Sequence, residues 1–165
     1  MTAVSSQNEY TCRKGYIKDA EEIHILMQRA FADYGKSKSE EKKIVNSALK
    51  EDLKDIYNDL ENNIVLVLSD GKKIIASLRL EEISDQRYLL KRFAVSPNYQ
   101  NHGLGTMLFS NAVKKLKKIN AHYLQLYSSL ENEKLIKFYQ GLGFNCLETD
   151  QKKGYERGLW VKTLK

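Results

Sequence analysis

The segment with the clearest chemical potential is a short loop, Gln100-Asn101-His102-Gly103-Leu104-Gly105. It lies between an apolar run that ends at Val95 and a helical pattern that begins at Leu104. The first amides of a helix have no partner within it and carry about half a positive charge, so they attract anions. Glycine lets the backbone approach a phosphate oxygen because no Cβ is in the way. The loop is therefore either an anion site, with Gln100 and His102 as further donors, or a plain tight turn.

Two common nucleotide-binding motifs do not fit this loop. The Walker motif ends in Gly-Lys-Ser/Thr, and that ending is absent here. The dinucleotide fingerprint needs a third glycine and a parallel β-α-β context, and the sequence has neither. If the loop binds an anion, it does so as part of another motif.

Two segments resemble one known family, in the order that the family requires. Gln100-x-x-Gly103-x-Gly105 resembles the Gln/Arg-x-x-Gly-x-Gly/Ala motif of the GNAT N-acetyltransferase superfamily, and Phe93-Ala94-Val95-Ser96-Pro97 resembles the strand that leads into it. The segment from Asn132 to Phe144, with Phe138-Tyr139 and Gly143-Phe144, is similar to the family's Asn…Phe-Tyr…Gly-Phe helix. The resemblance extends over nearly the whole chain, from the helix after Tyr16 to the final strand.

The resemblance implies that acetyl-CoA is the acyl donor. Backbone amides from Gln100 to Thr106 would hold the pyrophosphate, and Phe93 to Val95 would pair with the pantetheine arm. An amide near Ala94 would face the thioester carbonyl. Asn132 would hold the pantetheine from the far side, and Tyr139 would protonate the departing thiolate. The implied cofactor-binding residues are Phe93, Ala94, Val95, Gln100, Asn101, His102, Gly103, Leu104, Gly105, Thr106, Asn132, Phe138 and Tyr139.

Several of these residues also have ordinary structural interpretations. Tyr139 falls on an apolar helical stripe, where a tyrosine usually belongs to the core. Asn132 is a suitable N-cap for the same helix. The structural alternative for His102 is an ordinary surface histidine. If His102 does meet the cofactor, we expect a contact through its backbone and no catalytic role for its side chain.

The general base and the acceptor are less well indicated than the donor. Many relatives carry a glutamate on the strand before the loop, but the segment Tyr88 to Phe93 has no carboxylate. Glu81 and Glu82 are the nearest candidates, and a solvated strand end is their alternative role. Arg79 and Arg92 would recognise an acceptor carboxylate if their side chains point into the cleft. The alternative is that both side chains lie on the outside of the molecule. In the family the acceptor site is shaped by the first two helices and the loop between them, which corresponds to Tyr34 to Lys43, with Gly35.

The surrounding elements are predicted from periodicity and turn signals. Asp19 and Glu22 predict a capping box before a helix whose stripe runs from Ile23 to Tyr34. A second helix carries Leu49, Leu53, Ile56, Tyr57 and Leu60 on one face, a third runs from Leu104 to Ile119, and a fourth ends at Gly141-Leu142-Gly143. Strands are predicted at Tyr10–Ile17, Ile64–Leu68, Ile74–Leu80, Tyr88–Val95, Tyr123–Tyr127, Phe144–Glu148 and Tyr155–Lys162, with a hairpin turn at Asp70-Gly71.

This order predicts an α/β (α+β) fold with a mixed, mostly antiparallel sheet of about seven strands and four helices. The 165 residues suit a single domain over 1–165, with residues 1–8 as a flexible leader. The leader lacks the features of a secretory signal, and no apolar run could span a bilayer, so we expect a cytoplasmic protein.

The composition bounds the partners. The two cysteines predict free thiols, and the three scattered histidines predict no metal site. The net charge of +6 comes mainly from lysine, which favours a solvated surface over nucleic-acid binding. We therefore expect an amine-bearing acceptor, no nucleic acid, no membrane, and a monomer or homodimer. The alternatives are a non-catalytic acyl-CoA-binding module of the same fold and, after it, a nucleic-acid-binding protein.

Overall fold

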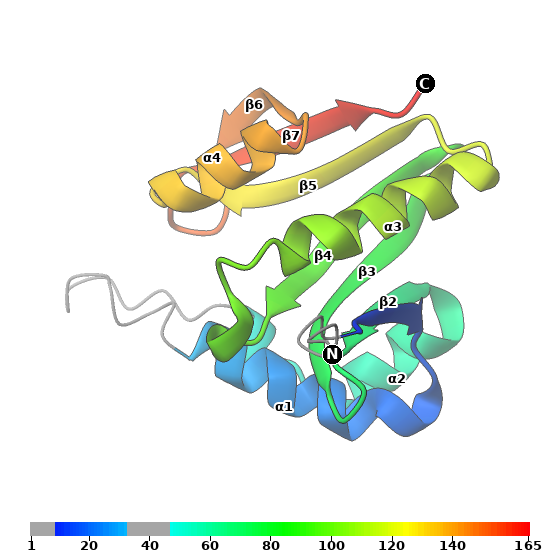
Figure 1. Cartoon of the computed structure of the whole chain (residues 1–165). Helices are drawn as coiled ribbons and strands as arrows, with labels where there is room; N and C mark the ends of the chain where they lie inside the picture. The colour runs from blue at the N-terminus through cyan, green and yellow to red at the C-terminus, as the bar shows by residue number, and fades with distance from the viewer. Residues whose placement is uncertain (1–8, 33–46) are drawn as a thin grey trace, which may run out of the picture. The chain divides into compact units, whose positions relative to one another are not determined.

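The structure is a computed structural model that describes residues 9–32 and 47–165. The predicted fold is confirmed: this part of the chain forms a mixed seven-stranded sheet with four α-helices (Figure 1). The elements are β1 (Thr11–Lys14), α1 (Ala20–Phe31), α2 (Leu53–Asn62), β2 (Ile64–Ser69), β3 (Ile74–Ser84), β4 (Arg87–Val95), α3 (Leu104–Lys118), β5 (Tyr123–Ser129), α4 (Glu133–Gly141), β6 (Asn145–Asp150) and β7 (Arg157–Thr163). The predicted leader and the segment Tyr34 to Lys43 with Gly35 lie outside the described residues.

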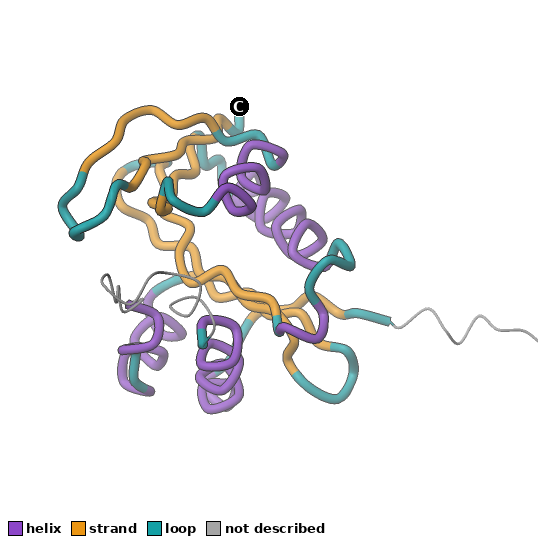
Figure 2. Tube along the Cα trace, turned by 90° about the vertical axis from the view of Figure 1, so that its left-hand side faces the viewer, coloured by secondary structure: helices purple, strands orange, loops and turns teal. Residues whose placement is uncertain are grey.

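The strands are ordered β1-β2-β3-β4-β5-β7-β6 across the sheet. β1 pairs with β2, β5 with β7, and β6 with β7, all antiparallel. The short connections 70–73 and 85–86 join neighbouring strands, which makes β2, β3 and β4 an antiparallel meander as predicted. β4 and β5 are parallel and are connected through α3 (Figure 1), because parallel neighbours need a crossover. The expectation that the loop lacks a parallel β-α-β context is therefore wrong, because the β4–β5 pairing could not be read from local patterns. Figure 2 shows the strands in orange and the helices in purple.

The residue contacts divide the chain into two compact units, and β3, β4 and α3 each contribute residues to both. One unit consists of the chain up to Arg79 together with Arg92–Asn111, and the other of Leu80–Lys91 together with Ala112–Lys165. In the first unit, α1 and α2 lie side by side and enclose a core that includes Ile23, Met27 and Ile56, each with 0% of its surface exposed. The predicted apolar stripe of α1 is therefore confirmed over its described length.

The prediction for the second helix is partly wrong. Leu49 belongs to a separate 3-10 turn, Ser47–Lys50, and α2 begins only at Leu53. The helix begins there because Asp52 caps it: its carboxylate accepts the Asp55 amide at 3.0 Å, and Asp55 accepts the Asp52 amide at 3.1 Å. Tyr57 is exposed, and the charged Asp59 takes a buried position on the helix instead.

The predicted capping box at Asp19 and Glu22 is also wrong. Asp19 has helical backbone angles, and its carboxylate makes no side-chain cap bond. The carboxylate instead accepts the Tyr16 amide at 2.8 Å and two guanidinium bonds from Arg13 at 2.8 and 3.0 Å. The Arg13 hydrogen bond holds the pKa of Asp19 below its ordinary value. Glu22 accepts the Ile74 amide, so it ties α1 to the start of β3.

In the second unit, β5 and β7 pair along their whole length, from Tyr123 opposite Thr163 to Ser129 opposite Arg157. The end of α4 is closed as the glycines predict. Gly143 takes a left-handed φ of 95°, and the Phe144 amide bonds back to the Tyr139 carbonyl at 3.1 Å. This closure turns the chain sharply into β6.

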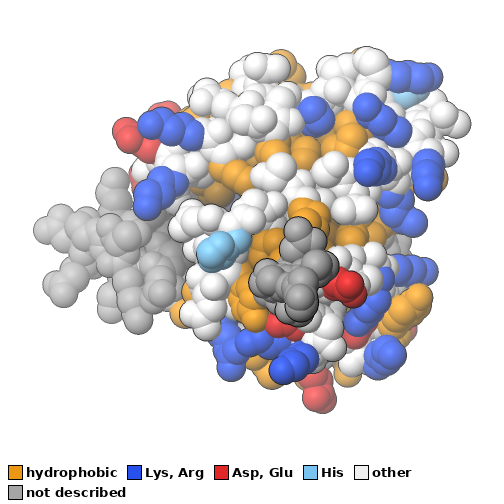
Figure 3. Space-filling model, viewed as in Figure 1, with side chains coloured by type: hydrophobic (Ala, Val, Ile, Leu, Met, Phe, Trp, Pro, Cys, Tyr) orange, Lys and Arg blue, Asp and Glu red, His pale blue; other side chains and the backbone are white. Residues whose placement is uncertain are grey.

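The residues that the structure describes contain no group of three or more His, Cys, Asp and Glu that could hold a metal ion. No helix among them is long and apolar enough to cross a membrane. Cys12 and Cys146 are free thiols, as predicted. On the face seen in Figure 3, Lys and Arg side chains stand in several separate places.

Candidate active site

The loop between β4 and α3 contains hydrogen bonds between its own backbone and side-chain groups. A 3-10 turn, Pro97–Tyr99, follows β4, and the Tyr99 amide bonds to the Ser96 carbonyl at 2.8 Å. The Gln100 side-chain amide donates to the Val95 carbonyl at 3.0 Å. Gln100 was predicted as a donor to an anion, but here one of its N–H groups fastens the loop to the end of the strand.

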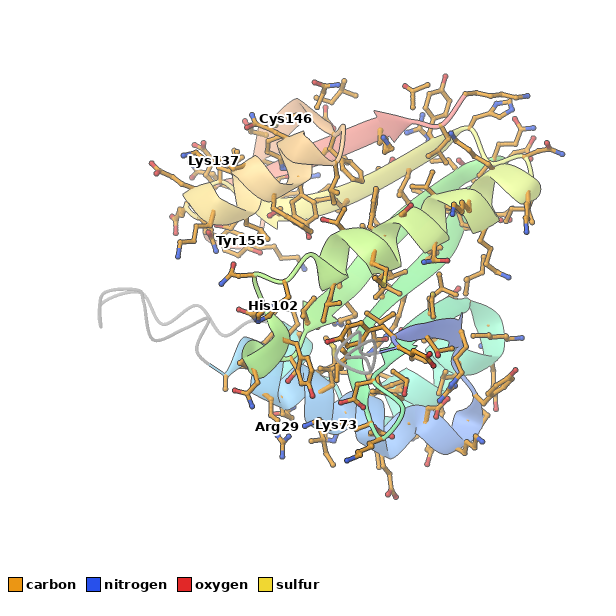
Figure 4. All side chains as sticks on the ribbon, in the orientation of Figure 1. Arg29, Lys73, His102, Lys137, Cys146 and Tyr155 are labelled. Carbon is orange, nitrogen blue, oxygen red and sulfur yellow. The ribbon has the colours of Figure 1, made fainter. Side chains whose placement is uncertain are left out.

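The next residues turn the backbone towards solvent. Asn101 has φ 67° and Gly103 has φ 76°, so two of three consecutive residues are left-handed. Asparagine and glycine are the residues that most readily adopt this conformation. His102 lies between them with an exposed side chain, at the loop that precedes α3 (Figure 4). The sequence Asn-His-Gly thus sets the local shape of the loop.

The N-terminus of α3 is built to leave its amides available. The first helical bond runs from the Met107 amide to the Gly103 carbonyl at 3.0 Å, which makes Gly103 the N-cap. Glycine has no side-chain oxygen with which to satisfy the amides of Leu104, Gly105 and Thr106, and the first turn contains no acidic residue. These predicted pyrophosphate-binding residues therefore lie together at one electropositive helix end, where the Leu104 side chain is buried and Thr106 is exposed. A Cβ added at Gly103 would meet nothing within 4 Å, so there is room for a ligand.

The end of β4 leads into this loop with its side chains on alternating faces. Phe93 stacks on Phe109 of α3 with ring centroids 6.5 Å apart, while Ala94 belongs to the core beneath α1 and α2. Arg92, just before them, has a left-handed φ of 53°, which is unusual for a residue inside a strand. The pairing of β4 with β5 covers Arg87 to Leu89. Phe93 to Val95, predicted to pair with pantetheine, thus follow a kink in the strand.

The remaining predicted residues lie on α4, in the second unit. Asn132 caps α4, because its side-chain oxygen accepts the Leu135 amide at 3.1 Å. The structural interpretation of Asn132 is therefore confirmed, and its amide nitrogen could still donate to a ligand. Tyr139 is 9% exposed, with its ring centroid 5.5 Å from that of Phe138 and 5.8 Å from that of Phe144. These contacts fix the ring of Tyr139 on the helix.

The comparison with known families agrees with these features. A family model described as "Acetyltransferase (GNAT) family" matches residues 23–144, which include the loop, α3 and the whole of α4. The chain belongs to this acetyltransferase family. An uncharacterized N-acetyltransferase of Methanocaldococcus jannaschii is 29% identical over 83 residues, which is 50% of this chain and 34% of that protein. The chain thus spans about a third of the length of the curated relative that it matches.

Solved structures show the same fold. The PaiA N-acetyltransferase of Thermoplasma acidophilum, in complex with coenzyme A, superposes with a TM-score of 0.81 at 22% identity, over 94% of this chain and 99% of that one. The ribosomal-protein-S18-alanine N-acetyltransferase of Escherichia coli gives a TM-score of 0.76 at 20% identity, over 94% of each chain. At these identities the likeness establishes the GNAT fold alone.

The two candidate bases of this GNAT chain are already engaged. Glu81 forms an ion pair with Lys91 at 2.7 Å, and both side chains are partly exposed. Glu82 is exposed and accepts the Tyr88 hydroxyl at 2.8 Å. Burial and this bond to Glu82 raise the pKa of Tyr88 to about 12, so Tyr88 stays protonated at neutral pH. The role of either glutamate as a base stays a prediction.

The structure places Arg79 in the core, which corrects both alternatives given for it. Its side chain is 0% exposed and forms a two-pronged pair with Glu51, with Nη2 to Oε1 at 2.7 Å, and a bond to Asp59 at 2.9 Å. Burial lowers the pKa of Arg79, but the bonds to Glu51 and Asp59 outweigh this effect and raise it overall. Arg92 joins the same cluster, with its Nε 3.1 Å from Glu51. Arg79 therefore holds the fold together and does not meet an acceptor.

Glu51 and Asp59 are the residues that sequence reasoning missed. Both are buried, at 6% and 5% exposure, although charged residues are seldom buried unless paired. A signal was present in the sequence: Arg79 lies inside the apolar run of β3, and a buried arginine requires carboxylates. The hydrophobic pattern alone does not say which carboxylates supply the pairs.

The loop geometry predicts the effect of a methyl group at Gly103. Gly103→Ala should weaken coenzyme A binding roughly tenfold, because a Cβ at the N-cap of α3 keeps a phosphate oxygen from approaching the backbone as closely as glycine allows. The left-handed φ should also lower the free energy of unfolding by about 1 kcal/mol.

A matched control separates these two effects. Gly154 is likewise left-handed, at φ 83°, with nothing within 4 Å of an added Cβ, but it lies in the β6–β7 connection. Gly154→Ala should cost the same stability and leave coenzyme A affinity intact in calorimetric titration. Equal affinity for the two variants would argue against a ligand at Gly103.

Proposed function

We propose that this chain transfers an acetyl group from acetyl-CoA to a primary amine of a small molecule or peptide. The observation that carries the proposal is the glycine-capped N-terminus of α3, which follows the left-handed loop in a chain of the GNAT family. A polyanionic donor fits this helix end because the available amides and the helix dipole favour negative charge. An amine acceptor is supported by the names of the two structural neighbours, both of which are N-acetyltransferases.

Each predicted residue group has a role in this proposal. The amides of Gln100 to Thr106 hold the pyrophosphate, and Phe93 to Val95 line the pantetheine, with an amide near Ala94 donating to the thioester carbonyl. Asn132, Phe138 and Tyr139 contact the thiol end of the donor from α4. The donor supplies an activated thioester, and the protein supplies its orientation and the proton transfers.

The proposed reaction is direct attack in a ternary complex. The neutral amine nitrogen forms a bond to the acetyl carbon, and the bond between that carbon and sulfur breaks. The nitrogen loses a proton to a base, either Glu81 or Glu82, directly or through water, and the departing sulfur receives a proton from Tyr139. Because the amine must be neutral to attack, the rate should rise with pH towards the pKa of the acceptor amine.

The cofactor assignment can be tested before the acceptor is known. Coenzyme A at a hundred times its Kd should stabilise the protein by about 2.7 kcal/mol, which raises Tm by roughly 5–10 °C in thermal unfolding. Pantetheine, which lacks the pyrophosphate, should give a much smaller shift at the same concentration. The absence of any shift with coenzyme A would end the proposal.

A second candidate is a non-catalytic acyl-CoA-binding module of the same fold. It is favoured by one observation: β4 carries no carboxylate, and the two candidate bases, Glu82 and Glu81, already bind Tyr88 and Lys91. Thiol release from acetyl-CoA with a panel of amines, peptides and polyamines, followed by mass spectrometry, separates the two candidates. Binding of coenzyme A without acetylated product across the panel would support the module.

A further inference from the structure

A tyrosine at the entrance to the loop is tied to a distant hairpin turn. Tyr99 is the last residue of the 3-10 turn and directly precedes Gln100. Its hydroxyl donates to Asp70 Oδ2 at 2.8 Å, and the Lys73 ammonium lies 5.5 Å from the centroid of its ring. Asp70 and Lys73 belong to the turn between β2 and β3, where Figure 4 shows Lys73. Two side chains of one turn thus hold a single ring.

The turn that holds Tyr99 is itself closely braced. The other carboxylate oxygen of Asp70 accepts the backbone amides of Lys72 and Lys73, both at 2.9 Å. The Asp70 amide bonds across the turn to the Lys73 carbonyl at 3.1 Å, and Gly71 supplies the left-handed φ of 96°. Both oxygens of Asp70 are therefore used, one within the turn and one on Tyr99. The turn is a stiff support because its backbone cannot shift without breaking these bonds.

The Tyr99 hydroxyl and the Asp70 carboxylate each keep one protonation state at neutral and mildly alkaline pH. The amides of Lys73 and Lys72, and then the Tyr99 hydroxyl, hold the pKa of Asp70 below its ordinary value. The bond to Asp70 raises the pKa of Tyr99. Asp70 is thus ionised and Tyr99 protonated at neutral and mildly alkaline pH, so the bond should not titrate during an assay.

Tyr99 lies between a chain segment that is bonded to β3, at Ser96, and the exposed loop that begins at Gln100. The Ser96 amide bonds to the Ile75 carbonyl of β3 at 2.7 Å, which anchors the chain just before the 3-10 turn. Exposed residues with left-handed backbone begin two positions after Tyr99, at Asn101. An anchor at Tyr99 therefore fixes the point from which the loop departs.

We propose that Tyr99 is a positioning residue which, through Asp70, holds the loop Gln100–Gly103 in the shape that receives the pyrophosphate. The inference rests on the proposed function, because it assigns the loop to coenzyme A. A loop that is shaped before binding costs less ordering when the ligand arrives, so loss of the anchor should appear in affinity.

The test variant is Tyr99→Phe, which keeps the ring beside Lys73 and removes only the hydroxyl. The Kd for coenzyme A and the KM for acetyl-CoA should rise roughly threefold to tenfold, as for one lost hydrogen bond, while kcat and its pH profile stay unchanged. Inhibition by pantetheine should not change, because pantetheine has no pyrophosphate for the loop to receive. Tyr57→Phe removes an exposed hydroxyl from α2 and serves as the matched control.

The outcomes distinguish this inference from the proposed function. If wild-type protein does not bind coenzyme A, both fail. If wild-type protein binds and Tyr99→Phe binds equally well, the positioning role is wrong and the proposed function stands. If Tyr99→Phe weakens coenzyme A and pantetheine alike, Tyr99 supports the fold in general and not the loop. Asp70→Asn keeps one oxygen for the amides of Lys72 and Lys73 and places an NH2 group beside the Tyr99 hydroxyl, which can accept from it, so this variant should give an intermediate Kd.

Discussion

Replacing Tyr139 by phenylalanine should lower kcat by about a hundredfold or more and leave the Kd for coenzyme A unchanged. The reason is that the proposed donor of the proton to the departing sulfur is the phenol hydroxyl alone. Phenylalanine retains the ring, which is packed against Phe138 and Phe144 with 9% of the residue exposed. The variant should therefore fold normally, with the free energy of unfolding changed by no more than about 1.5 kcal/mol.

The measurement is steady-state kinetics with an accepted amine, together with calorimetric titration of coenzyme A. Tyr127→Phe is a suitable control because Tyr127 is 45% exposed and its ring keeps Arg157 at 4.3 Å in either form. Its kcat should match that of the wild type. An unchanged kcat for Tyr139→Phe would remove the hydroxyl from the mechanism and leave Tyr139 as a core residue.

The second large effect concerns stability. Arg79→Met should lower the free energy of unfolding by about 3–5 kcal/mol, which lowers Tm by roughly 10 °C. The substitution leaves the carboxylates of Glu51 and Asp59 buried without the guanidinium that neutralises them. Arg92 alone would then face Glu51, and it is partly exposed. Denaturant unfolding monitored by circular dichroism would measure the loss, with an unchanged m-value if folding stays two-state.

Two further variants define the cause of this loss. Arg29→Met changes an exposed arginine on α1 and should alter the free energy of unfolding by less than about 0.5 kcal/mol. The double variant Arg79→Met with Glu51→Met removes one charge of each sign and should be more stable than Arg79→Met alone, because one fewer buried carboxylate has lost the Arg79 guanidinium. A double variant less stable than either single variant would show that packing volume, not charge balance, controls the site.

Prediction from sequence succeeded where the local structure depends on residues that are close together in the sequence. The stripe of α1 at Ile23, Leu26 and Met27 is buried as its spacing requires, and the turns at Gly71 and Gly143 have the left-handed φ that glycine permits. The loop from Gln100 to Gly103 precedes α3 as predicted, because its residues determine their own backbone shape. The capping prediction failed at Asp19 because Arg13 and the Tyr16 amide compete for the same carboxylate.

The sequence by itself determined the order of elements, the family and the position of the loop from Gln100 to Gly103, because all three are carried by short-range patterns and motifs. Only the tertiary structure decided which groups are paired. Arg79 meets Glu51 across 28 residues, and Tyr99 meets Asp70 across 29. The physical reason is that a buried charge or hydroxyl takes whichever partner the folded chain brings within hydrogen-bond distance, and many carboxylates along the chain are equally suitable.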